Sequence, residues 1–115
     1  MSEIDAQIQI AEATLEDAKE TVKLGDMLEK LYSNREFKKI ILDGYFRDTA
    51  TSLTANLTNP AMLDKRDDLV EQLVGISALR THLFAVNTKA QHAREAIEAH
   101  EYEIELLRQE AVEGV

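Results

Sequence analysis

The sequence predicts an all-α protein, a long antiparallel helical hairpin or coiled coil with a kinked first arm and a thicker helical head. Three observations predict this class. Apolar residues recur at steps of three and four in both halves of the chain, as they do along a coiled-coil seam. The 115 residues include one Pro and four Gly, so few positions interrupt a helix. The one strong stop signal, Asn59-Pro60, lies near the middle, where a hairpin would turn.

The first predicted helix covers residues 2–32. Its apolar stripe consists of Ile4, Ile8, Ala11, Leu15, Ala18 and Val22. These alternating steps of four and three correspond to heptad positions a and d. The next stripe position is Gly25. We therefore expect Ile8, Leu15 and Val22 to contribute to the core of a two-helix stem.

A second helix is predicted to begin at a capping box, in which Ser33 caps the helix and Glu36 stands three residues later. Tyr32 and Phe37 flank this box and could form a hydrophobic staple. The helix should continue to Leu57. Gly44 lies on the way, but a Gly inside a helix costs only about 1 kcal/mol relative to Ala.

The third predicted helix is long, from about residue 64 to residue 110. Asn59 can cap a helix and Pro is favoured at its first position, so this dipeptide is expected to end one helix and begin the next; Asp64 is a rival cap. The stripe comprises Leu69, Leu73, Ile76, Leu79, Leu83, Val86, Ala90, Ala93, Ile97, His100, Ile104, Leu107 and Ala111.

A hairpin about Asn59-Pro60 brings the two stripes together. The expected pairs are Val22 with Ile97, Leu15 with Ile104 and Ile8 with Ala111, and Leu107 completes the predicted stem core. A slip of one heptad would also match apolar positions, so the stripes leave the register open. His100 takes a core position, where a polar residue can set the register of a coiled coil.

Charge divides the expected single domain, residues 1–115, into two regions. The stem consists of residues 1–32, with a net charge of −5, and residues 88–115, with a net charge of −4. The head, residues 33–87, has a net charge of zero. A net charge of −9 does not favour binding to nucleic acid phosphates. A solvated helix face is the simplest explanation of the acidic stem, and a basic partner protein is the alternative.

The head has more apolar residues than a two-helix seam can bury. Those expected beyond the seam, and therefore at an interface with another chain, are Tyr45, Phe46, Val70, Val74 and Phe84. Either the head folds back into a compact bundle or these residues meet a partner. We expect a homo-oligomer that associates through the head, because like charges on the stems repel one another.

The sequence contains no recognisable catalytic site, and we expect neither enzymatic activity nor a cofactor. There is no Cys, and His82, His92 and His100 are not clustered with other ligands, so no metal site is expected. Phosphate-binding loops and nucleophile elbows are absent. The first residues do not follow a signal-peptide pattern and no run approaches about 18 uninterrupted apolar residues. We therefore expect a cytosolic protein that does not enter a membrane.

One phrase near the middle is distinctive. The segment Glu36-Phe-Lys-Lys-Ile-Ile-Leu-Asp-Gly-Tyr-Phe46 follows the first heptad helix and precedes the second. It resembles a phrase of the form F-K-K-x-x-L-D-G-Y-F in small coiled-coil-containing proteins of tailed bacteriophages. The resemblance implies a virion-associated, assembly or host-interaction role, in the virion or in the host-cell cytoplasm. It implies no catalytic residues.

Two functions fit these patterns. The first is an oligomeric phage structural, virion-associated or assembly component, which the wide apolar head favours. The second is a small acidic regulatory protein that binds and inhibits a host protein through a basic surface, which the acidic stem favours.

Overall fold

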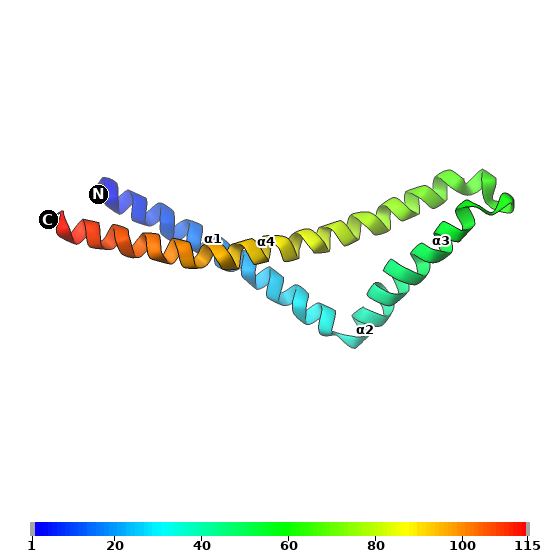
Figure 1. Ribbon diagram of the computed structural model, residues 1–115, viewed down its shortest axis with the longest axis horizontal. Coiled ribbons are helices and arrows are strands. Elements are labelled where there is room, and N and C mark those ends of the chain that lie inside the picture. The colour runs from blue at the N-terminus through cyan, green and yellow to red at the C-terminus, as the bar shows by residue number, and fades with distance from the viewer. Residues whose placement is uncertain (1, 115) are drawn as a thin grey trace. The chain divides into compact units, whose positions relative to one another are not determined.

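The computed structural model describes residues 2–114 (Figure 1), and within this range the chain is helical and contains no strand. The elements are α1 (Glu3–Ser33), α2 (Arg35–Phe37), the π-helix η1 (Lys38–Thr49), α3 (Ala50–Leu57), the 3₁₀-helix η2 (Pro60–Lys65) and α4 (Arg66–Glu113). The predicted all-α class is confirmed. The third helix, expected over about residues 64–110, is observed as the 48-residue α4.

Contacts divide the chain into two units. The terminal unit comprises the chain up to Met27 and from Val86 onward, and the middle unit comprises Leu28–Ala85. These bounds lie within five residues of the stem and head expected from the charge pattern. Helix α4 contributes to both units.

The terminal unit is an antiparallel pair formed by α1 and the C-terminal part of α4. Figure 1 shows the blue part of α1 beside the orange and red part of α4, with both termini at the same end. Its buried cluster contains Ala11, Leu15 and Ile104, and Ile97 and Leu107 pack against it. The heptad stripes therefore form the seam, because these residues occupy a and d positions on both helices.

The remaining predicted stem-core residues, Ile8 and Val22, are half-buried. The two helices approach closely at Gly25, which is buried at the next stripe position. A Cβ atom built on Gly25 would overlap the Cβ of Ala90, whose exposed fraction is 0%. The absence of a side chain at Gly25 is thus what permits this spacing.

Two ion pairs flank the seam. Arg108 Nη2 lies 2.8 Å from Glu12 Oε1, and Arg94 Nη2 lies 2.8 Å from Asp26 Oδ1. The acids are two heptads apart on α1 and the arginines are two heptads apart on α4, so one register serves both pairs. Lys19 and Glu101 occupy the equivalent position midway between them, although Lys19 contacts Glu16 at 3.7 Å here.

These charges select the register that the apolar stripes leave open. A slip of one heptad in one direction would place Glu12 opposite Glu101 and Lys19 opposite Arg94. A slip in the other direction would place Lys19 opposite Arg108. Like charges across a coiled-coil seam are unfavourable, and flanking charges set orientation and partner choice in this way.

Within the middle unit the helix breaks at Asn34, where the prediction from sequence was wrong by one residue. Asn34, not Ser33, is the N-cap: its Oδ1 accepts a hydrogen bond of 2.8 Å from the Phe37 backbone N–H. Ser33 ends α1, and its hydroxyl donates to the Glu29 carbonyl at 3.1 Å. Asn caps a helix about as well as Ser, and the Ser33 hydroxyl has a local acceptor within α1.

The Tyr32 and Phe37 rings have centroids 6.1 Å apart, but with Asn34 as the cap they are not the positions that form a hydrophobic staple. Glu36 remains in the first turn of α2. Without Ser33 as the cap, no capping box forms.

The segment after the cap is continuous through Gly44 but is wound as a π-helix over Lys38–Thr49. In a π-helix the hydrogen bonds join residues five apart, so residues four and five apart share a face. Tyr45, Phe46 and Ala50 thereby reach one side and pack against the buried cluster of Leu53, Leu69 and Ile76. This winding explains why the apolar residues here do not follow a single stripe of period 3.6.

The chain reverses between α3 and α4, as predicted. Asn59 caps η2 by accepting a hydrogen bond of 3.0 Å from the Ala61 backbone N–H, and Pro60 occupies the first turn. Leu57 and Met62, on either side of the turn, pack against the same buried cluster as Tyr45. The reversal therefore places α3 beside the N-terminal part of α4.

Candidate interaction surface

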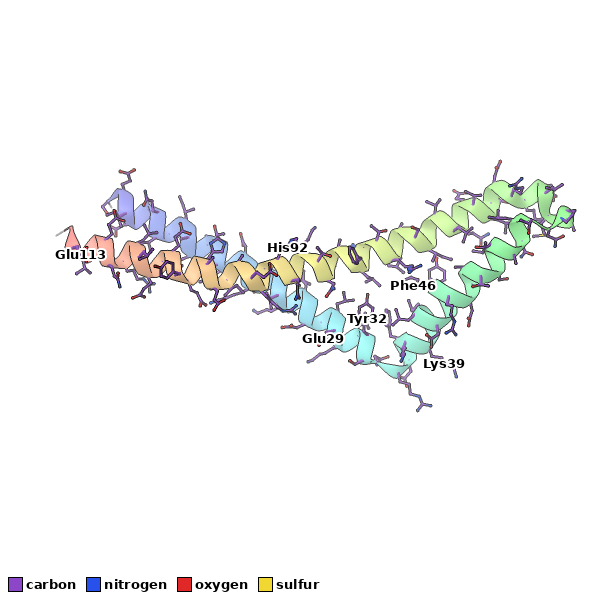
Figure 2. All side chains as sticks on the ribbon, viewed as in Figure 1. Glu29, Tyr32, Lys39, Phe46, His92 and Glu113 are labelled. Carbon is purple, nitrogen blue, oxygen red and sulfur yellow. The ribbon has the colours of Figure 1, made fainter. Side chains whose placement is uncertain are left out.

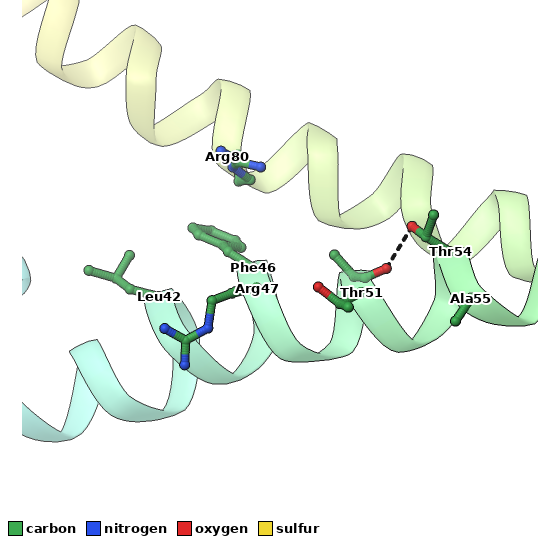
Figure 3. Close-up of a pocket in the computed structure, with 8 residues that line it drawn as sticks. Leu42, Phe46, Arg47, Thr51, Thr54, Ala55 and Arg80 are labelled. Carbon is green, nitrogen blue, oxygen red and sulfur yellow. Dashed lines mark hydrogen bonds between the residues drawn. The ribbon is translucent and has the colours of Figure 1, made fainter.

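An open groove of about 740 Å³ lies in the middle unit, between the segment formed by η1 and α3 and the first part of α4 (Figure 3). Leu42, Phe46 and Ala50 supply apolar lining. The remaining lining residues are Arg47, Thr51, Thr54, Ala55 and Arg80. The groove thus combines an apolar floor with two cations and contains no acidic lining residue.

Arg80 is the more available of the two cations. Its Cζ lies 5.8 Å from the centroid of the Phe46 ring, an arrangement that favours the cation through the ring quadrupole. Within residues 2–114, no carboxylate forms an ion pair with Arg80. Figure 2 shows Phe46 on the side of η1 that faces α4.

Arg47 has acidic neighbours on its own helix. Its Nε lies 2.9 Å from Asp48 Oδ1, and its Nη1 lies 3.9 Å from Asp43 Oδ1. The hydrogen bond to Asp48 is the main reason that the pKa of Arg47 is raised above its ordinary value. Arg80 therefore presents the less compensated charge at the groove.

An apolar face of α4 adjoins the groove. Val70, Val74 and Phe84 expose 47%, 61% and 69% of their surface. Phe84 also lines a smaller hollow with Ser77, Thr81 and Arg80, and Arg80 belongs to the main groove as well. Three of the five residues expected at an interface are therefore exposed apolar residues on a single helix.

Tyr45 and Phe46 are the other two residues expected at an interface, and the structure places them elsewhere. Both pack against the buried cluster of Leu53, Leu69 and Ile76 and are half-buried. The prediction that they lie beyond the intramolecular packing was wrong, because both side chains contribute to the packing of this segment against α4. Phe46 still lines the groove on its remaining surface.

The helical segment Pro60–Glu113 includes an 18-residue window with mean hydropathy 1.2, of which 11% is buried. By length and composition alone, such a helix could cross a membrane. The apolar residues of α4 between Leu69 and Phe84 are interrupted by Glu71, Arg80 and His82.

The sequence interpretation did not identify Arg47 and Arg80 as site residues. Each is a single basic residue on a predicted helix, which ordinarily indicates a solvated face, and only the packing of α3 against α4 brings them to one groove.

Across residues 2–114, no group of three or more His, Asp or Glu side chains could hold a metal ion. His100 lies half-buried in the seam, with Nδ1 3.6 Å from Glu103 Oε2.

Comparisons with protein-family models, curated proteins and solved structures found no match.

Proposed function

We propose that this chain is a non-enzymatic helical interaction protein that self-associates through the exposed apolar face of α4 in the middle unit. The observation that carries the proposal is the exposure of Val70, Val74 and Phe84 on one helix. Covering side chains that are half to two-thirds exposed contributes about 1–2 kcal/mol each. Covering all three therefore contributes about 3–6 kcal/mol against an association cost of about 4–15 kcal/mol, so further contacts must contribute as well.

The biological setting we propose is a phage structural, virion-associated or assembly component, located in the virion or the host-cell cytoplasm. The resemblance of the segment Phe37–Phe46 to phage coiled-coil proteins supports this setting. The proposed partners are further copies of the chain and other proteins of the particle. Nucleic acid and membrane are not among them.

A second function is supported by the charge distribution. Residues 1–32 and 88–115 together account for the whole net charge of −9. That distribution suits a regulatory protein that occupies the basic surface of a host protein and inhibits it. In that case the terminal unit would be the binding region.

The mass of the protein in solution tests the first function. We expect an oligomer for the wild type, and monomers for Val74→Glu and for Phe84→Glu, because each places a carboxylate in the apolar contact. Ile10→Glu is a matched control, since Ile10 in the terminal unit is also 69% exposed; it should remain oligomeric. Light scattering gives the mass, and circular dichroism verifies that the helices persist.

A wild type that stays monomeric at the highest soluble concentration would overturn self-association. If the chain then captured a host protein by binding the basic surface of that protein, the second function would be supported. Vesicle co-sedimentation covers the remaining possibility: binding to neutral lipid vesicles that Phe84→Glu abolishes would show that the apolar face meets lipid instead of protein.

A further inference from the structure

We propose that the groove of the middle unit receives an acidic, apolar strip of α4 from the terminal unit of a second copy of the chain. This inference rests on the proposed self-association and adds to it a second contact, beside the exposed apolar face of α4. On the receiving side are the groove floor, with Leu42, Phe46 and Ala50, and the cation of Arg80. A surface that docks into this groove must therefore offer apolar side chains together with carboxylates.

Such a strip is present on the outer face of α4 in the terminal unit. Tyr102 and Leu106 expose 67% and 46% of their surface and stand four residues apart, so they lie on the same face of the helix. Glu98 stands one helical turn before Tyr102, Glu105 stands between Tyr102 and Leu106, and both glutamates are exposed. Neither glutamate forms an ion pair with a basic side chain in residues 2–114.

The two surfaces are complementary in kind. An amphipathic helix that lays apolar residues at i and i+4 into an apolar groove is a common form of protein recognition. The groove supplies a cation without an acidic partner, and the strip supplies carboxylates without basic partners. Glu98 and Glu105 are two helical turns apart, about 10 Å along the axis, so a helix docked through Tyr102 and Leu106 has two positions from which a carboxylate can reach Arg80.

Charge also argues against the other pairings of these surfaces. A contact between two strips would oppose glutamates with glutamates, and a contact between two grooves would oppose Arg80 with Arg80. Complementary potentials favour the mixed pairing, and like charges brought together disfavour the alternatives. Because the groove and the strip are different patches, the contact is heterologous, and further copies can add to it. Such growth suits an assembly component.

Charge reversal on each side tests the inference. Arg80→Glu and the double substitution Glu98→Arg with Glu105→Arg should each weaken self-association about tenfold at low salt, because they oppose like charges. An equimolar mixture of the two proteins should regain association, because each then offers opposite charge to the other. Arg66→Glu, on the same helix but outside the groove lining, is the control and should associate as the wild type does.

Sedimentation velocity gives the masses, and circular dichroism confirms that each variant is helical. If Phe84→Glu disrupts the oligomer while both charge-reversal proteins associate normally, the groove and strip do not meet, although self-association through α4 stands. If the mixture fails to regain association, the pairing is likewise wrong. If the wild type is monomeric, this inference and the proposed function both fail.

Discussion

A methyl group at position 25 should destabilise the terminal unit, although Ala usually stabilises a helix relative to Gly. Replacing Gly by Ala inside a helix contributes about 0.8–1 kcal/mol of stability. At Gly25 the new Cβ would overlap the Cβ of Ala90, which has no rotamer by which to move away. Overpacking of this kind costs about 1–3 kcal/mol. We therefore expect Gly25→Ala to lower the free energy of unfolding by up to about 2 kcal/mol.

The chain contains its own matched control. Gly75 lies inside α4, the helix that contains Ala90, and a Cβ built on it meets no atom within 4 Å. Gly75→Ala should therefore raise the free energy of unfolding by about 1 kcal/mol through helix propensity alone. The same chemical change thus has opposite effects at the two sites, and denaturant titrations followed by circular dichroism measure both.

A compensating substitution identifies the contact itself. Ala90→Gly alone should cost about 1 kcal/mol, because it introduces Gly into a helix. Combined with Gly25→Ala, it removes the overlap. The double variant should therefore lose less free energy of unfolding than the sum of the two single losses, by about 0.5–3 kcal/mol. Equal stabilisation by Gly25→Ala and Gly75→Ala would refute this reasoning and show that α1 and α4 do not meet in this register.

Two further predictions follow from local contacts. Asn34→Ala should lower the free energy of unfolding by about 0.5–2 kcal/mol because it removes the N-cap of α2, whereas Ser33→Ala should change it by less than about 0.5 kcal/mol, as at ordinary surface sites; the opposite order in denaturant midpoints would restore Ser33 as the cap. Reversing both Arg94 and Arg108 to Glu should destabilise the terminal unit by about 1 kcal/mol at low salt, and a loss that persists unchanged in 1 M salt would show that charge is not its cause.

The heptad stripes explain why much of the fold could be predicted. Ile104 and Leu15 were expected to meet, and they share one buried cluster. Such positions can be predicted from the sequence because burial in a helical pair requires apolar residues at a fixed period, whatever the partner. The reversal at Asn59-Pro60 could be predicted for an equally local reason, since Pro lacks the N–H that a helix interior requires.

The candidate site could be predicted only in part. Val70, Val74 and Phe84 were expected to lie beyond the seam, and they are exposed. Phe46 was expected there too, but it packs against the buried cluster of Leu53, Leu69 and Ile76. The segment carries more apolar residues than one seam can hold, so its pattern does not determine which of them face α4.

What the sequence by itself determined is the helical class, the seam residues and the point of reversal, because each follows from local periodicity or from the chemistry of one dipeptide. Only the tertiary structure decided the register and the composition of the groove. An apolar stripe repeats every seven residues and therefore matches itself after a slip of one heptad. The close approach of Gly25 to Ala90 and the pairing of Asp26 with Arg94 do not repeat in this way, so they select one register. Arg80 likewise reaches Phe46 only because α3 packs against α4, a contact between residues that are far apart in the chain.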